Sequence, residues 1–153
     1  MADDGTLNRT TENAALREAL AAEHTAVWGY GVVGAALGAQ HRGSAASAEA
    51  AHRDVRDRVT ALLAGRKADP VEPKAAYALP FPILSAVDAA ALGVVLEDGV
   101  AAAWVRVLDQ AAQRSTRELA VGLVSAAEVR AVGWRSAAGK KPVTSALPGL
   151  PAK

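Results

Sequence analysis

The sequence contains no cysteine, one methionine at its start and one isoleucine, Ile83. The absence of cysteine excludes disulfides, thiolate metal sites and cysteine nucleophiles. Aromatic residues make up only 4% of the chain, whereas alanine supplies 38 of its 153 residues. Because alanine favours helices, and isoleucine and aromatic residues, which favour strands, are scarce, this composition predicts a helical protein.

An excess of charge of either sign is also missing. Lysine and arginine total 17, aspartate and glutamate total 16, and the net charge is +1. This balance argues against nucleic-acid and membrane partners, which select clustered positive charge. The longest uncharged run, 25–40, is shorter than the roughly 20 apolar residues of a spanning helix. The polar start of the chain, with Asp3 and Asp4, is unlike a signal peptide, so we expect a cytoplasmic protein.

Four helices are predicted from apolar residues that recur every three or four positions. Thr11 is the expected N-cap of the first helix, and Gly65 is the expected end of the second. The third begins with the capping pattern Ser85-x-x-Asp88. The first turn is expected at 39–43, and the predicted helices are 11–40, 44–64, 85–112 and 116–138.

A proline-containing stretch separates the second and third predicted helices. Four prolines between positions 70 and 82 exclude a regular helix there. Tyr77, Phe81 and Ile83 are too apolar to extend freely into solvent, so we expect the stretch to cross the length of a bundle and pack on it. Short turn, long crossover and short turn are the connectivity of a ferritin-like four-helix bundle, with the second and third helices parallel.

The predicted fold is therefore all-α, a ferritin-like four-helix bundle with one long crossover between helices two and three. The expected organisation is a flexible N-terminus at 1–10, the bundle at 11–139 and an extended tail at 140–153 that packs on the bundle. The prolines of the tail predict its extended form, and its leucines predict its contact with the helices.

Two carboxylates interrupt the apolar seams, Glu23 in the first helix and Glu97 in the third. Buried acids are costly unless they are paired or liganded. The expected turn puts Arg56 level with Glu97 and Arg130, with His52 about one helical turn from Arg56. We therefore predict a buried salt-bridge cluster of Glu23, His52, Arg56, Glu97 and Arg130.

A metal centre is the alternative. Glu49 and His52 have the E-x-x-H spacing that places two ligands on one helix face. Carboxylates and imidazole suit iron, so Glu23, Glu49, His52 and Glu97 form the candidate ligand set. The second E-x-x-H motif expected on the fourth helix is missing.

The iron hypothesis requires two features of the structure. The first helix must end near Gly34, so that Glu23 and Glu49 come level. Arg56 must turn outward, toward Asp57 or solvent. The register expected from the turn at 39–43 meets neither requirement, so we favour a chain without a cofactor and keep iron as the alternative.

No pattern in the sequence identifies a catalytic residue. Glycine is plentiful, but no G-x-G-x-x-G or phosphate-binding loop lies between a strand and a helix. No serine occupies a nucleophile elbow. The favoured function is therefore a metal-free binding or interaction module with a buried polar cluster. An iron-dependent oxidase or iron-handling protein is the alternative, and the identity of any small ligand or partner protein is left open.

Several motifs together resemble a known family over most of the chain, from about Leu16 to Pro151. The stretches that carry the resemblance are Glu23-His24, Trp28 to Gly34, His52-Arg53 with Arg56, Ala76 to Pro82, Leu96 to Trp104, Trp134-Arg135, and Pro142 to Pro151. They are similar to an actinobacterial ferritin-like family of unknown function.

The resemblance implies a four-helix ferritin-like fold and side-by-side homodimers. It brings no established activity. The wider ferritin-like group includes iron oxidases and iron stores, whose ligands follow the order Glu, E-x-x-H, Glu. Glu23, Glu49, His52 and Glu97 fit that order.

Overall fold

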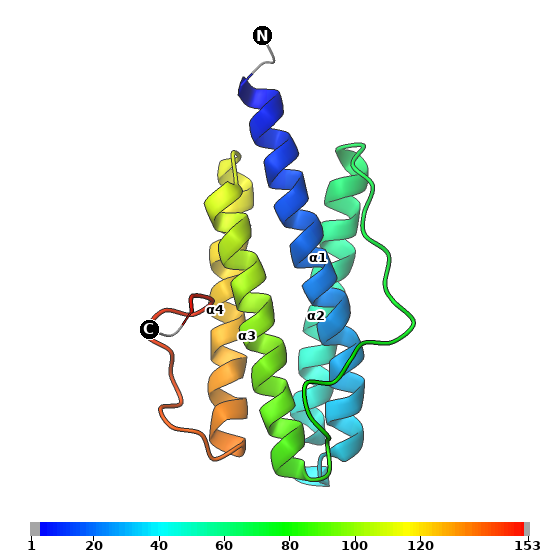
Figure 1. Cartoon of the computed structure of the whole chain (residues 1–153), viewed down its shortest axis with the longest axis vertical. Helices are drawn as coiled ribbons and strands as arrows, with labels where there is room; N and C mark the ends of the chain where they lie inside the picture. The colour runs from blue at the N-terminus through cyan, green and yellow to red at the C-terminus, as the bar shows by residue number, and fades with distance from the viewer. Residues whose placement is uncertain (1–3, 152–153) are drawn as a thin grey trace.

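The computed structural model describes residues 4–151, which contain four helices and no strand (Figure 1). Neighbouring helices α1 and α2 run in opposite directions, α3 runs parallel to α2, and α4 runs back beside α3 (Figure 1). The predicted all-helical bundle with a long crossover is confirmed. No helix in this described range is both long and apolar enough to cross a membrane. The helices are α1 (Asp4–Ala36), α2 (Ala39–Gly65), α3 (Ala86–Gln110) and α4 (Arg114–Ala137).

The crossover between α2 and α3 runs back along the bundle from one end to the other (Figure 1). Three contacts attach it to α1. Arg17 Nε donates a 2.7 Å hydrogen bond to the carbonyl of Asp69, and His24 Nε2 lies 3.0 Å from the carbonyl oxygen of Val71. The rings of Trp28 and Tyr77 lie 5.8 Å apart. The crossover therefore packs on the bundle.

The first helix begins earlier than the sequence analysis predicts. It starts at Asp4 rather than Thr11, so residues 4–10 belong to α1 instead of a flexible end, and only 1–3 lie outside the described residues. No glycine or proline stands between residues 5 and 29, so nothing interrupts the helix at Thr11. Instead of capping a helix, Thr11 lies within one.

The turn between α1 and α2 also differs from the prediction. Helix α1 ends at Ala36 and α2 begins at Ala39, whereas the expected turn lay at 39–43. Gly38 takes an extended conformation, with φ −66° and ψ 166°, and precedes the first turn of α2. The earlier turn shifts the register of α2 against α1, so that Glu23 is level with His52 rather than with the residues beyond Arg56.

Three of the four possible neighbouring helix pairs pack closely. Helix α1 packs on α2 and α3, and α3 also packs on α4, whereas α2 and α4, both fully described, do not pack closely along their length. Two glycines permit the close approaches. A Cβ on Gly29 would lie 2.7 Å from Leu96, and one on Gly93 would lie 2.8 Å from Trp134. The bundle is therefore closed on three sides and open between α2 and α4.

The C-terminal tail lies on α3 and α4. Arg135 of α4 is buried and donates to the carbonyl of Val143, 2.9 Å away, and to Glu128. The Glu128 carboxylate in turn accepts from the backbone N–H of Ser145 at 2.7 Å. Gly149, with φ +78°, approaches the backbone of α3 so closely that a Cβ would lie 2.6 Å from the carbonyl oxygen of Ala101.

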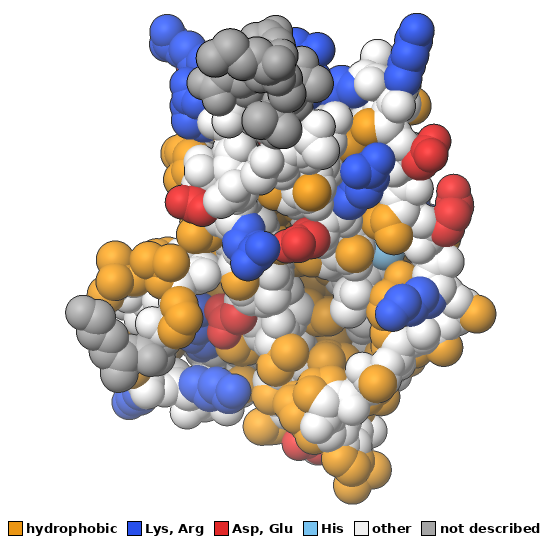
Figure 2. Space-filling model, turned by 45° about the horizontal axis from the view of Figure 1, so that its top comes forward, with side chains coloured by type: hydrophobic (Ala, Val, Ile, Leu, Met, Phe, Trp, Pro, Cys, Tyr) orange, Lys and Arg blue, Asp and Glu red, His pale blue; other side chains and the backbone are white. Residues whose placement is uncertain are grey.

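Apolar side chains are exposed where the crossover enters α3. Leu84 is 87% exposed, and Leu79, Val87 and Val95 are exposed as well. Hydrophobic side chains gather at the lower end of the face shown in Figure 2. This end of the bundle is therefore more apolar than the opposite end, where charged side chains surround the helix termini (Figure 2).

Candidate functional site

One polar side chain from each helix meets in a single layer of the bundle. Glu23 comes from α1, His52 from α2, Glu97 from α3 and Arg130 from α4. The His52 ring lies between the two carboxylates, with Nδ1 2.6 Å from Glu23 Oε2 and Nε2 3.1 Å from Glu97 Oε1. Arg130 Nε donates to Glu97 Oε1 at 2.8 Å. We call these four residues the charged layer; they are four of the five residues predicted to cluster.

Three aromatic residues complete the hydrogen bonds of the charged layer. Trp104 Nε1 donates to Glu23 Oε1 at 2.8 Å, and the Tyr30 hydroxyl donates to Glu97 Oε1 at 2.5 Å. Trp134 Nε1 donates to the Tyr30 oxygen at 2.7 Å. None of these three aromatic residues was among the predicted site residues. The sequence does carry a signal for two of them. Tyr30 and Trp104 each follow a buried glutamate by seven residues, which places each ring on the same helix face as that glutamate.

The contacts of His52 fix its charge. Burial alone lowers the pKa of His52, but the hydrogen bonds to Glu23 and Glu97 outweigh burial and raise that pKa above its usual value. Burial likewise favours the neutral form of Glu97, yet the hydrogen bonds from His52 and Arg130 outweigh it, and the pKa of Glu97 is lowered. The contacts therefore favour a protonated His52 between the two glutamates, and with Arg130 it can balance their charge.

Tyr30 stays a hydrogen-bond donor in this setting. Its burial and the neighbouring charge of Glu97 raise the pKa of its phenol far above the usual value. One polar atom of the layer lacks a partner, since Glu97 Oε2 is buried without a hydrogen bond in the described part of the protein. Glu97 therefore presents one fully engaged oxygen and one free oxygen.

Two predicted site residues lie outside the charged layer. Arg56 turns away from the core and pairs through Nε with Asp57 at 2.8 Å, so its predicted place in the buried cluster is wrong. Glu49 pairs with Arg53 at 2.5 Å, with about a quarter of its side chain exposed. The turn at Gly38 explains both positions, because it brings His52 rather than Arg56 level with the buried glutamates.

The candidate iron ligands are therefore brought together only in part. Glu23, His52 and Glu97 meet, whereas Glu49 does not join them. Both ring nitrogens of His52 already face carboxylates, and the Arg130 guanidinium, a cation, donates to one of the same carboxylates. Within residues 4–151, no group of three or more acidic or histidine side chains is arranged to hold a metal ion. The donor set does not fit a carboxylate-bridged iron centre.

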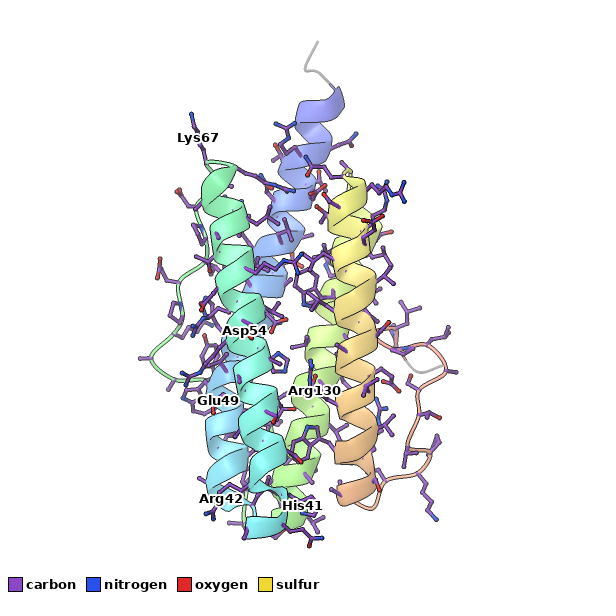
Figure 3. The ribbon with its side chains drawn as sticks, turned by 180° about the vertical axis from the view of Figure 1, so that it is seen from behind. His41, Arg42, Glu49, Asp54, Lys67 and Arg130 are labelled. Atoms are coloured by element: carbon purple, nitrogen blue, oxygen red, sulfur yellow. The ribbon has the colours of Figure 1, made fainter. Side chains whose placement is uncertain are left out.

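A groove lies between α2 and α4, beside the charged layer. Its volume is about 1140 Å³, and Arg130 and Trp134 form part of its wall. In Figure 3, Arg130 reaches from α4 into the space between the two helices, and His41 marks the lower end of that space. The other lining residues are mostly small or hydroxylated: Gln40, Gly43, Ser44, Ser47, Ala48, Ala51, Val129, Gly133, Ser136 and Ala137.

A third buried carboxylate, Glu12, joins the ends of three helices. It accepts hydrogen bonds from the backbone N–H groups of Ala112 and Gln113, at 2.7 and 2.9 Å, and from the Thr116 hydroxyl at 2.6 Å. Arg66 pairs with it at 2.7 Å. Burial alone raises the pKa of Glu12, but these partners outweigh it and lower the pKa. The sequence analysis missed this site, although Glu12 stands one helical turn before Leu16 in the apolar seam.

These features define a class of protein: an all-helical bundle with a charge-balanced layer inside it and an open groove beside that layer. The chain belongs to the family described as a domain of unknown function, DUF4439, which matches residues 15–152. The predicted membership of a family of unknown function is confirmed. That description does not mention ferritin, so the ferritin-like kinship stays a prediction.

A solved structure is similar to this chain. It is the crystal structure of a conserved hypothetical protein, rv2844, from Mycobacterium tuberculosis. The two proteins are 35% identical, the match covers 83% of this chain and 96% of the other, and the TM-score is 0.81. No curated protein matches the chain. The comparisons therefore support the fold and the family but assign no activity.

Proposed function

We propose that the protein is a metal-free binding module whose ligand site is the groove between α2 and α4. The groove itself carries the proposal. Small-molecule sites typically enclose about 300–1,000 Å³ and combine apolar walls with a few fixed polar groups. The groove, at about 1140 Å³, has walls mostly of alanine, glycine and serine, with Arg130 and Trp134 on one side.

The charged layer gives this groove a rigid wall. Arg130 is tied to Glu97, and Trp134 is tied through the Tyr30 hydroxyl to the same carboxylate. Side chains held by buried hydrogen bonds lose little further entropy when a ligand arrives. Both groove residues are therefore held in place before binding, as a recognition site requires.

The charges support a site without metal. In carboxylate-bridged iron centres, the metal ions balance several acidic ligands. Here, protonated His52 and Arg130 balance Glu23 and Glu97, and each cation is within hydrogen-bond distance of its partner. The positive charge that a metal would supply is provided by two side chains of the protein itself.

A groove-filling variant tests the proposed site. Gly133 lines the groove, and a Cβ added there would meet no other atom within 4 Å. Gly133→Leu should therefore fill the groove without a clash while favouring the α4 helix. Gly122→Leu is the matched control, because Gly122 lies on the same helix, also has free space at Cβ and does not line the groove.

The readout is the fluorescence of the uncharged probe phenylnaphthylamine, titrated into each purified protein. We expect wild-type protein and Gly122→Leu to bind the probe with equal affinity, and Gly133→Leu to lose that binding. Circular dichroism should show that both variants remain helical. Equal binding by all three proteins would mean that the probe lies elsewhere, and the proposed site would be wrong.

The oligomeric state stays a prediction from the family resemblance. Sedimentation velocity on the purified chain distinguishes the expected homodimer from a monomer. This measurement is independent of the groove, because filling Gly133 should leave the sedimentation coefficient unchanged if the dimer does not use the α2–α4 side. A single species with the mass of one chain would contradict the homodimer.

A further inference from the structure

The geometry points to an elongated, singly negatively charged amphiphile as the ligand of the groove, with its anionic head on the guanidinium of Arg130. This inference rests on the proposed function. It goes further by assigning a chemical class and an orientation to the ligand. Three observations carry it: the free donors of Arg130, the absence of acidic lining residues and the shape of the groove.

Arg130 has donors available for a ligand. Its Nε is used by Glu97, whereas neither η nitrogen has a hydrogen-bond partner within the described part of the chain. About a quarter of the side chain is exposed, and it lines the groove. Charge-assisted hydrogen bonds from a guanidinium to a carboxylate or sulfonate are among the stronger polar contacts in proteins, and they strengthen where water is excluded.

The lining also selects the sign of the charge. No aspartate or glutamate lines the groove, and Arg130 and His41 are its titratable residues. The carboxylate of Glu97 lies behind Arg130, but protonated His52 offsets it on the other side. A cationic head would meet Arg130 without an acidic partner, so the groove disfavours it.

The shape of the groove fits a long apolar body. On α2 the lining runs from Gln40 to Ala51, which corresponds to roughly 16 Å of helix. Ala48, Ala51 and Ala137 leave room for a chain along the wall formed by Trp134. Arg130 lies at the inner end of this path, while Gln40 and His41 lie at the outer end, so the head binds in the middle of the bundle.

Two probes that differ only in charge test the inference. Anilinonaphthalene sulfonate is phenylnaphthylamine with an added sulfonate group. If the sulfonate binds Arg130, the anionic probe should bind wild-type protein about tenfold more tightly than the neutral one, the gain expected of one charge-assisted hydrogen bond. Arg130→Gln should bring the affinities for the two probes together, and because both are measured on the same variant, their ratio reports the lost charge separately from any change in the groove wall. Arg106→Gln, an exposed arginine on α3 that does not line the groove, should keep the difference.

A competition experiment on the wild-type protein needs no variant. Dodecanoate should displace bound phenylnaphthylamine at concentrations where dodecyltrimethylammonium, with the same chain and a positive head, does not.

Equal displacement by the two detergents would overturn the inference, as would equal affinity for the two probes. If Gly133→Leu still blocks phenylnaphthylamine in that case, the groove remains the site and only the assignment of an anionic ligand is wrong. If Gly133→Leu blocks neither probe, the proposed function itself is wrong.

Discussion

At the scale of single residues, Arg130 is the cation on which the buried Glu97 carboxylate depends. Removing one partner of a buried ion pair leaves the other charge unpaired. Arg130 is partly exposed, so we expect Arg130→Met to lower the free energy of unfolding by about 2–4 kcal/mol, near the lower end of the range for buried pairs. Urea denaturation monitored by circular dichroism measures this loss.

Arg56→Met is the matched control for Arg130→Met. Both substitutions replace an arginine that pairs with an acid, but Asp57, the partner of Arg56, is exposed to solvent. Exposed pairs contribute little to stability, so the urea midpoint of Arg56→Met should match that of the wild-type protein. A large loss in this variant, with little change in Arg130→Met, would show that the register of α2 is wrong.

His52 predicts a dependence of stability on pH. Its pKa in the folded protein is raised above the usual 6.5, because hydrogen bonds to Glu23 and Glu97 outweigh its burial. The folded protein therefore holds this proton more tightly than the unfolded chain. Its contribution to stability is complete below pH 6.5 and is lost as the pH rises through the folded pKa. We expect the free energy of unfolding to fall in that range, by at most about 1.4 kcal/mol per pH unit for this one group.

Urea denaturation across neutral and alkaline pH measures the slope due to His52. His41→Gln removes an exposed histidine and should keep the slope, whereas His52→Gln should remove it. Nitrogen NMR of the imidazole gives an independent readout on wild-type protein, where both ring nitrogens of His52 should carry protons at neutral pH. A neutral ring there would contradict the charge balance of the layer.

Glu97 makes the opposite contribution at acid pH. Burial is outweighed by the hydrogen bonds from His52 and Arg130, so its folded pKa lies below the usual 4.5. The stability that Glu97 provides is therefore present above pH 4.5 and lost as the pH falls through the folded value. Glu12, Glu128 and the exposed Asp57 have lowered pKa values as well, so acid unfolding reports on all four carboxylates together.

At the scale of helices, Glu12 of α1 holds the turn between α3 and α4. Its carboxylate accepts from the N–H groups of Ala112 and Gln113 in that turn and from the hydroxyl of Thr116 in the first turn of α4. We expect Glu12→Gln to lower the free energy of unfolding by about 1–3 kcal/mol, since an amide cannot accept from all these donors. Amide hydrogen exchange should accelerate in the first turn of α4.

Glu18→Gln is the control for Glu12→Gln. Glu18 also lies on α1 and also pairs with an arginine, Arg106, but both side chains are more than half exposed. This variant should leave exchange in α4 at the wild-type rate. Equal acceleration in both variants would mean that α4 responds to a general loss of charge on α1 rather than to the contacts of Glu12.

The predicted helices were largely correct because the apolar seams extend over many turns. The turn between α1 and α2 was misplaced because 34–44 contains glycine and alanine throughout, and either residue can continue a helix or end it. Helix α1 ends at Ala36 and Gly38 precedes α2, a register in which His52 meets Glu23, a contact distant in the sequence. Such tertiary contacts are invisible to local propensity.

The same limit explains which site residues could be predicted. Glu23, His52 and Glu97 are polar residues at positions where the helical pattern calls for apolar ones. The pattern alone therefore predicts that they are buried. Arg56 and Arg130 were both predicted in the cluster, but only Arg130 lies there. The turn before α2 comes a few residues earlier than expected, and this shift moves Arg56 out of the layer. The E-x-x-H spacing places Glu49 and His52 near one another on α2, but it does not show whether either residue points toward a neighbouring helix. Glu49 was therefore wrongly grouped with the buried His52.

At the scale of the whole molecule, the open side of the bundle is what the sequence could not predict. Helix α4 carries small residues at Gly133 and Ala137, and α2 carries them at Ala48 and Ala51. Small residues on facing helices usually permit close packing. Here α2 packs on α1 and α4 packs on α3, and the groove lies between α2 and α4.

Iron titration decides between the two functions considered for this bundle. Ferrous iron is added anaerobically, oxygen is admitted, and near-ultraviolet absorbance and metal content are measured after desalting. We expect no stoichiometric retention and no oxygen-dependent band. A metal would have to displace the protonated His52 from between its two carboxylates and leave Arg130 beside the bound cation. Glu49, the missing ligand, is engaged with Arg53 instead.

Variants make this iron experiment decisive. If one iron per chain were retained, and if the retention disappeared in Glu97→Ala and His52→Ala, the charged layer would be a metal centre and the metal-free function would be wrong. Glu49→Ala separates the two possible ligand sets. Loss of retention in this variant would mean that α2 rotates to bring Glu49 inward, and unchanged retention would mean that Glu23, His52 and Glu97 hold the metal by themselves. Retention that persists in all three variants would place the iron outside the layer.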